Sequence, residues 1–292
     1  MGLLYDRKIE LNLYFSGTMT TVKDLHVSFS VTVTQDKEPN QATITIYNLS
    51  PTTRAQMSAG LLGVELIAGY GNDASMIFKG SWDPLVSSVI HTRTGADWET
   101  TIETGEGLKE YTGSFFDRTY PAGTLIQRIV KDVAGSLGLP IINDYLGTEA
   151  IAYARTYSGR SVDILTDVLK GLGLGFIWSI QNGTLEIRPE GVPLRKNAEA
   201  VLLTPRTGLI GPAVLTETGI EVECFLNPAI RPGKLIKVEG PIKTPAGVIA
   251  ALQKLGAPPP ASGVYRVVSA TYSGDNFGAD FSTRAEGVSY AP

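Results

Sequence analysis

The sequence has few of the residues that form disulfide and metal sites. Its 292 residues contain one cysteine, Cys224, and two histidines, His26 and His91. A lone cysteine cannot form an internal disulfide, so the sequence favours folding in a cytosolic compartment. Without a histidine cluster or a cysteine pair, a zinc site or another soft-metal site is not expected. We therefore predict no metal and no other cofactor.

Charge and hydrophobic runs argue against two further classes of protein. The 25 basic and 29 acidic residues give a net charge of -4, and no basic block stands out, which is the opposite of a nucleic-acid clamp. The longest apolar stretches, such as Leu61–Ala68, are far shorter than the roughly 20 residues of a membrane span. The N-terminus lacks the basic start and apolar run of a signal peptide. We expect a protein that is neither membrane-inserted nor secreted.

The first region, residues 1–107, alternates apolar and polar residues. Leu25–Val33 carries an apolar residue at every odd position, and Ala42–Leu49 repeats the pattern. Successive side chains of a strand point to opposite faces, so these runs predict a long hairpin. A serine cap and a proline predict a short helix at Thr52–Met57. Further strands are expected at Leu11–Phe15, Val64–Tyr70, Ser75–Trp82, Val86–Arg93 and Asp97–Thr104.

The period changes in the second region, residues 108–203. Leu125, Ile129, Val133 and Leu137 are four apart and precede Gly138, which predicts an amphipathic helix with a glycine cap. A second helix is expected from Ser161 to Gly173. Asn-Gly at 182–183 between two alternating runs, 175–180 and 185–188, predicts a hairpin. This region is therefore predicted to be α+β.

The third region, residues 204–292, returns to alternating strands. They are expected at Gly219–Phe225, Lys234–Glu239, Val264–Ser273 and Asp280–Ser289. Between them, a short helix at Ala246–Leu255 is expected to run into an extended Pro258–Pro260 segment. The predicted fold class is mainly β with an α+β insert: two barrel or sandwich domains flank a small domain of two helices and a hairpin.

The ends of the first and third regions resemble each other. Arg93–Gly107 and Ser273–Gly287 both contain a glycine-containing turn, a strand with an aromatic residue and a Glu-Gly ending. Two β domains of one type would explain the match. A chance match between two glycine-rich β segments explains it equally well.

No catalytic constellation outweighs its structural alternative. His26 shares the polar face of its strand with serine and threonine residues, so a solvated or interface histidine is favoured over a general base. Paired carboxylates could hydrolyse a glycosidic bond. However, Glu103 and Glu106 fit ordinary loop charge, and Asp163 and Asp167 fit helix capping and a solvent face. No catalytic residue is predicted, and the protein is not expected to be an enzyme.

Two other patterns also favour structure over binding. Gly171, Gly173 and Gly175 follow a helix and precede a strand, which is the reverse of a dinucleotide-binding loop. An aromatic cluster before the first predicted helix of the second region fits packing between a β domain and the insert better than a ligand platform. Its members are Tyr111, Phe115, Phe116 and Tyr120.

The Thr43–Pro51 run, Thr-Ile-Thr-Ile-Tyr-Asn-Leu-Ser-Pro, lies in a chain ordered as β region, insert and β region. This order and this run resemble the baseplate hub proteins of contractile-tailed phages, the late-control D family. The resemblance implies a homotrimer in which each chain contributes two related β domains to a pseudo-sixfold ring. The ring would link the sixfold tail tube to the threefold spike. The chain is short for that family, so a fused lysozyme is not expected.

The resemblance also implies partners and a location. The partners are other copies of the chain, the tail tube protein and the central spike protein, with tape-measure and baseplate wedge proteins as further candidates. Genomic DNA would pass through a polar or acidic lumen without specific binding. The protein would assemble in the host cytoplasm and reside in the tail baseplate of the virion. Competing hypotheses are a tube or distal-tail protein of a non-contractile tail, and a tail-associated peptidoglycan hydrolase or glycan-binding protein.

Overall fold

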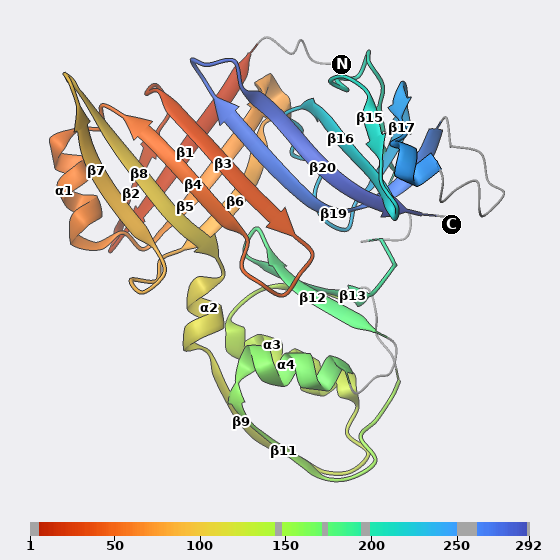
Figure 1. Cartoon of the computed structure of the whole chain (residues 1–292). Coiled ribbons are helices and arrows are strands. Elements are labelled where there is room, and N and C mark those ends of the chain that lie inside the picture. The colour runs from red at the N-terminus through yellow and green to blue at the C-terminus, as the bar shows by residue number, and fades with distance from the viewer. Residues whose placement is uncertain (1–5, 144–147, 171–174, 194–198, 250–261, 291–292) are drawn as a thin grey trace.

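The protein is mainly β with an α+β insert, as predicted (Figure 1). The structure is a computed structural model that describes residues 6–143, 148–170, 175–193, 199–249 and 262–290. The described strands do not close into a barrel, because the path of paired strands ends at β2 and β18.

Over its described residues, 6–107, the first region contains eight strands, one α-helix and a short 3-10 helix (Gly71–Asp73). Ser50 caps α1, since its Oγ accepts a hydrogen bond from the Thr53 backbone N–H at 3.1 Å, and a proline occupies the first turn. β2 was not predicted from the sequence. The elements are β1 (Arg7–Phe15), β2 (Thr18–Val22), β3 (Val27–Thr34), β4 (Gln41–Tyr47), α1 (Pro51–Gly60), β5 (Gly63–Tyr70), β6 (Ser75–Ser81), β7 (Ser88–Thr94) and β8 (Asp97–Glu106).

The insert contains the two predicted helices and the predicted hairpin, together with elements that the sequence did not reveal. Asn182 and Gly183 both have positive φ, as a tight hairpin turn requires. The unpredicted elements are a short helix, a two-stranded ribbon of β9 and β11, and a short strand, β10, that pairs in parallel with β13. The insert runs through α2 (Leu108–Gly113), β9 (Phe115–Tyr120), α3 (Ile126–Leu137), β10 (Ile141–Asn143), β11 (Arg155–Arg160), α4 (Ser161–Lys170), β12 (Phe176–Gln181) and β13 (Thr184–Pro189).

The third region is again made of strands. β14 lies at residues 201–203, which the sequence analysis assigned to the second region, but it pairs in parallel with β17 of the third region. The predicted helix at Ala246–Leu255 and the Pro258–Pro260 segment lie largely outside the described residues. The strands are β14 (Val201–Leu203), β15 (Ala213–Leu215), β16 (Gly219–Phe225), β17 (Leu235–Glu239), β18 (Ile242–Lys243), β19 (Ser262–Asp275) and β20 (Phe281–Ser289).

One sheet crosses both β regions. Its central strands follow the order β16-β20-β19-β3-β4-β8, so the two regions meet where β19 pairs with β3 in antiparallel register. In the first region β1, β5 and β6 lie behind β3, β4 and β8 as a second layer (Figure 1). Residues of both regions share one hydrophobic core, which includes Ile44, Phe78 and Tyr272.

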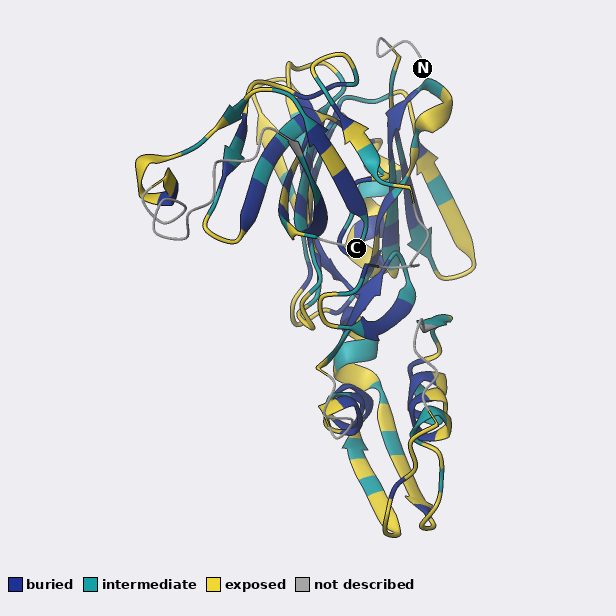
Figure 2. Ribbon diagram, turned by 90° about the vertical axis from the view of Figure 1, so that its right-hand side faces the viewer, coloured by how far each residue is buried: buried dark blue, intermediate teal, exposed yellow. Residues whose placement is uncertain are grey.

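The insert has its own core and projects from the β body as a narrow extension (Figure 2). Ile129 and Val133 of α3 pack with Leu165 of α4 and Trp178 of β12, and all four are buried. The apolar stripe read from the sequence is therefore the face that the two helices bury, except for Leu125, which precedes α3 and is 45% exposed. Removing a buried Ile or Leu side chain from such a core typically costs about 2–5 kcal/mol.

Candidate assembly interface

The two β regions repeat the same order of paired strands. In the first, β3 pairs with β4, β4 with β8, β8 with β7 and β6, and β6 with β5. In the third, β15 pairs with β16, β16 with β20, β20 with β19, and β19 with β17. The long β19 thus takes the places of both β6 and β7. All of these pairs are antiparallel, so the correspondence covers direction as well as order.

The strand pairing gives the register of this repeat. Ile102 opposes Ile44 in the core, and Ala285 opposes Val222 in the core. Ile102 therefore corresponds to Ala285, whereas the alignment read from the sequence set Ile102 beside Ser282. That alignment is wrong by three residues. A shift by an odd number of residues matches a core residue of one unit with a residue of the other unit that lies on the other face of the sheet.

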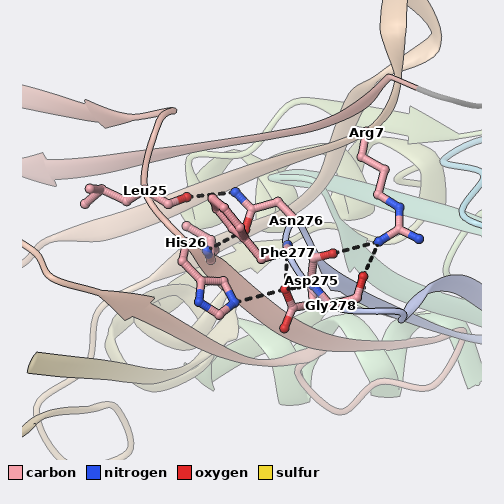
Figure 3. A network of polar contacts seen from close by, with 8 residues as sticks. Arg7, Leu25, His26, Asp275, Asn276, Phe277 and Gly278 are labelled. Atoms are coloured by element: carbon pink, nitrogen blue, oxygen red, sulfur yellow. Dashed lines mark hydrogen bonds and ion pairs between the residues drawn. The ribbon is translucent and has the colours of Figure 1, made fainter. Parts of the chain in front are cut away.

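A network of polar contacts stabilises the junction between β19 and β3 (Figure 3). The His26 ring lies 2.9 Å from Asp275 Oδ1 and stacks on Tyr47 with ring centroids 4.2 Å apart. Asn276 donates from its side chain to the Leu25 carbonyl at 2.7 Å, and its Oδ1 accepts from the Val27 N–H at 2.9 Å. The turn after β19 is thereby fixed to the start of β3.

Two further groups hold this turn. Arg7 donates to the backbone carbonyls of Asp275, at 3.1 Å, and of Gly278, at 2.6 Å. Burial acts to raise the pKa of Asp275, but the backbone N–H groups of Phe277 and Gly278, together with His26, outweigh it and lower that pKa. His26 is thus an interface histidine within the chain, one of the two roles favoured by its position on the polar face.

The sheet that runs through the junction presents one continuous polar face. Strand register places serine and threonine side chains opposite each other along its middle: Ser28, Ser30, Thr32, Thr43, Thr45, Thr101, Thr271, Ser273 and Ser282. Carboxylates lie toward both ends of the same face: Glu99, Glu103, Glu221, Glu223 and Glu286. The Arg284 guanidinium, from β20, is 3.7 Å from Glu221 and 3.5 Å from Glu223. The face therefore carries hydroxyl groups in its middle, with Asp275 opposite Ser28 at one margin of the junction, and carboxylates toward its ends.

β7 corresponds to the part of β19 that pairs with β3, and one edge of β7 is open. Among the described strands β7 pairs with β8 alone, while its counterpart in β19 pairs with β20 and also with β3. Ile90 of β7 is 53% exposed on the polar face. An open strand edge exposes backbone donors and acceptors that a further strand can pair.

Buried polar residues join the insert to the β body. Asn40 donates to Glu106 Oε2 at 2.8 Å and to the Gln181 side chain at 3.2 Å, and its Oδ1 accepts from the Thr34 N–H at 2.8 Å. Glu106 Oε1 accepts from the Gly183 N–H at 2.8 Å. Asn40, Glu106 and Gln181 are all buried. The turn of the β12–β13 hairpin is therefore held by a buried hydrogen-bond network.

Burial raises the pKa of Glu106 to about 8, and nearby Glu186 adds to the rise, although hydrogen bonds from Asn40 and Gly183 oppose it. The sequence-based expectation of ordinary loop charge is therefore wrong for Glu106. The error arose because a glutamate next to a turn glycine resembles solvent-facing charge until the insert covers it. Glu103 lies on the opposite, exposed face of β8.

The folding stability should fall with rising pH because of Glu106. Its pKa in the folded protein lies above the ordinary value of 4.5, so its contribution is complete below about 4.5 and is lost as pH rises through about 8. Urea midpoints should decline between about pH 4.5 and about pH 8. Glu106→Gln cannot ionise, so its midpoints should decline less over that range, even though it loses one accepted hydrogen bond. Equal slopes for the two proteins would contradict the assignment.

The other residues that the sequence analysis considered for a site do not form a single site. His91 bonds Thr100 Oγ1 at 2.9 Å, and burial lowers its pKa. Asp163 and Asp167 lie on the exposed face of α4. Gly171 and Gly173 lie outside the described residues, and Gly175 precedes β12 with φ +60°. Among the described residues no cluster could hold a metal ion. No helix in the described part of the chain is long and apolar enough to cross a membrane.

The aromatic cluster mostly packs inside the insert. Tyr120 is buried in the insert core, and Phe116 and Tyr111 pack against it. Tyr111 also lies 5.7 Å from Trp178 between ring centroids, while its hydroxyl is buried without a hydrogen-bond partner. Phe115 is the exception, because it is 68% exposed.

Comparison with known proteins identifies a family and a fold. A family model described as baseplate hub gp41 matches residues 8–245. A tail protein from Neisseria meningitidis MC58 aligns with a TM-score of 0.61 at 10% identity over 97% of each chain. The 43 kDa tail protein of prophage MuSo2 from Shewanella oneidensis aligns with a TM-score of 0.62 at 10% identity over 98% of each chain.

A third solved structure belongs to a secretion machine. A type VI secretion system component from E. coli aligns with a TM-score of 0.56 at 11% identity over 91% of this chain and 74% of its own. That protein is described as structurally similar to the T4 bacteriophage tail proteins gp27 and gp5. At these identities the likenesses establish the fold alone. No curated protein sequence matches the chain.

Proposed function

The chain belongs to the baseplate hub gp41 family of phage tail proteins, and we propose that three copies form a hub ring in a contractile tail. The observation that carries this proposal is the junction of β19 with β3, where two β units with the same strand order join edge to edge. Three such chains provide six units. A similar edge-to-edge contact between chains, from the open edge of β7 to the end of β15 beyond its pairing with β18, would close them into a ring with threefold symmetry and near-sixfold geometry.

The polar face provides a lumen for this ring. Hydroxyl side chains fill its middle, and five glutamates against one arginine lie toward its ends. Such a surface repels the phosphate backbone of DNA, and its one arginine, Arg284, lies beside Glu221 and Glu223. Genomic DNA and a tape-measure protein would therefore pass without being held.

The partners follow from symmetry and fold. A ring with six similar units matches a sixfold tail tube on one side, while its threefold order matches a trimeric spike on the other. The E. coli relative in fold, described as similar to T4 gp27 and gp5, supports a position next to a spike. The three inserts would be further contact points for baseplate proteins. Assembly would take place in the host cytoplasm, and no catalytic step is assigned to the chain.

The proposal is tested by mass and symmetry. Light scattering of the purified protein should give three times the chain mass, and electron microscopy of the particles should show a threefold ring. A stable monomer at all concentrations, with no binding to tube or spike proteins, would contradict the proposal. A hexamer would favour a tube or distal-tail protein instead. Clearing of a peptidoglycan zymogram would favour a hydrolase.

A further inference from the structure

A cleft lies between the β body and the insert, next to the polar network of the β12–β13 turn. It has a volume of about 840 Å³, within the range typical of ligand sites, and continues into a neighbouring cleft of about 460 Å³ that shares five of its lining residues. The β3–β4 loop and the ends of β4 and β8 form one wall, and α4 forms the other. Trp178, Tyr111, Leu108, Val162 and Pro39 provide the apolar part of the lining.

Charge in the two connected clefts is predominantly negative. The lining includes six carboxylates: Asp36, Glu38, Glu103, Asp163, Asp167 and Glu190. It includes three cations: Lys37, Arg160 and Lys170. Arg160 is already paired with Asp163 at 2.8 Å, which leaves five carboxylates facing two lysines. Such an excess favours a cationic occupant.

An apolar rim borders the same cleft. Val86 lines it and is 61% exposed, and the adjacent Leu85 is 91% exposed. Phe115, 68% exposed, is the strand partner of Arg160 in the lining. Large apolar side chains gathered at the mouth of a cleft mark a protein interaction site more often than isolated ones do.

The loop that carries Leu85 and Val86 is held in place by hydrogen bonds. Buried Asp83 accepts from the Leu85 N–H at 2.9 Å and from the Thr112 hydroxyl of α2 at 2.9 Å. Ser87 accepts from the Asp83 N–H at 3.2 Å and bonds Thr104 at 3.0 Å. The loop therefore presents its two apolar side chains at little further entropic cost on binding.

We propose that this cleft binds an extended cationic segment of a partner protein of the tail. Lysine or arginine side chains of that segment would face the carboxylates of the cleft, and its apolar side chains would rest on Leu85, Val86 and Phe115. The inference goes beyond the proposed ring and does not rest on it, because the lining comes from one chain.

A fluorescein-labelled octapeptide of alternating lysine and leucine tests the proposal by anisotropy on the full chain. Saturable binding with one peptide per chain is expected, and the corresponding glutamate–leucine peptide should not bind. Glu38→Gln combined with Asp167→Asn should weaken binding about tenfold, and Leu85→Ser should weaken it severalfold.

The matched control is Asp24→Asn combined with Asp73→Asn, which removes the same charge from exposed loops outside the cleft lining. It should leave the affinity unchanged. Three results would overturn the proposal: no saturable binding, equal weakening in both double variants, or preference for the acidic peptide. Self-association of the chain that the Glu38 and Asp167 substitutions abolish would also overturn it, by identifying a second copy as the occupant. The mass of the ring, measured separately, reports on the proposed function independently.

Discussion

Chains carrying Ile90→Cys and Thr216→Cys should cross-link into a covalent trimer when treated with a short thiol-specific reagent. The register comes from the internal junction, where Thr271 of β19 opposes Thr32 of β3. Ile90 takes the place of Thr271 in β7, since it opposes Thr101 as Thr271 opposes Arg284. Thr216 takes the place of Thr32, because Leu215 opposes Ile220 as Val31 opposes Ala42. The cross-link should therefore join β7 of one copy to Thr216 of the next, which follows β15 and lies beyond Ala213 and Val214, the two residues that pair with β18.

The native cysteine does not interfere with this experiment. Cys224 is buried, and burial raises the pKa of its thiol to about 12, so it stays protonated and unreactive. Thr32→Cys combined with Thr271→Cys is the matched control, because it should cross-link within one chain and leave the mass unchanged. If the control pair reacts and the Ile90 and Thr216 pair yields no trimer on a denaturing gel, the proposed ring contact is wrong.

Asn40→Asp should destabilise the fold by about 3–5 kcal/mol, as expected when an unpaired charge is buried. The substitution keeps the side-chain shape but removes the donors to Glu106, Gln181 and the Ile180 carbonyl. It also brings a second carboxyl against Glu106, which is itself buried. Urea denaturation at neutral pH measures the loss.

Asn72→Asp is the control for this substitution, because Asn72 is exposed and lies in the short 3-10 helix Gly71–Asp73. Its stability should change by less than about 0.5 kcal/mol, as is usual for a surface site. An Asn40→Asp protein within about 1 kcal/mol of the parent would show that the network is wetter than its burial indicates.

Local patterns predicted most of the strands and the helices of the insert. Alternation located β3, β4, β16 and β20, because each of these strands has one face in the core and one face outside it. The Asn182–Gly183 turn and the Ser50 cap were readable because their backbone geometry restricts the residue type. These features depend on near neighbours in the sequence.

The elements that the sequence did not reveal depend on distant partners. β9 and β11 lack a clear apolar period, and they form a ribbon by pairing Phe115 with Arg160 across 45 residues. Asn40, Glu106 and Gln181 read as polar loop or turn residues, and they are buried because the insert folds back over them. The cleft is likewise a product of two distant segments. Its carboxylates Glu103, Asp163 and Asp167 were considered in two separate pairs, and folding brings them to one cavity.

The covalent link between the two β units has a consequence for assembly. In the proposed ring, three of the six contacts between units form when each chain folds, through β19 and β3. Each association of free molecules costs roughly 4–15 kcal/mol in lost translational and rotational freedom. A ring of three chains requires about two such associations, whereas a ring of six separate units would require about five. The two β units of one chain also differ in what they carry. One of the two β units carries the insert. A nearly sixfold ring would therefore expose three inserts, which matches the symmetry of a threefold neighbour.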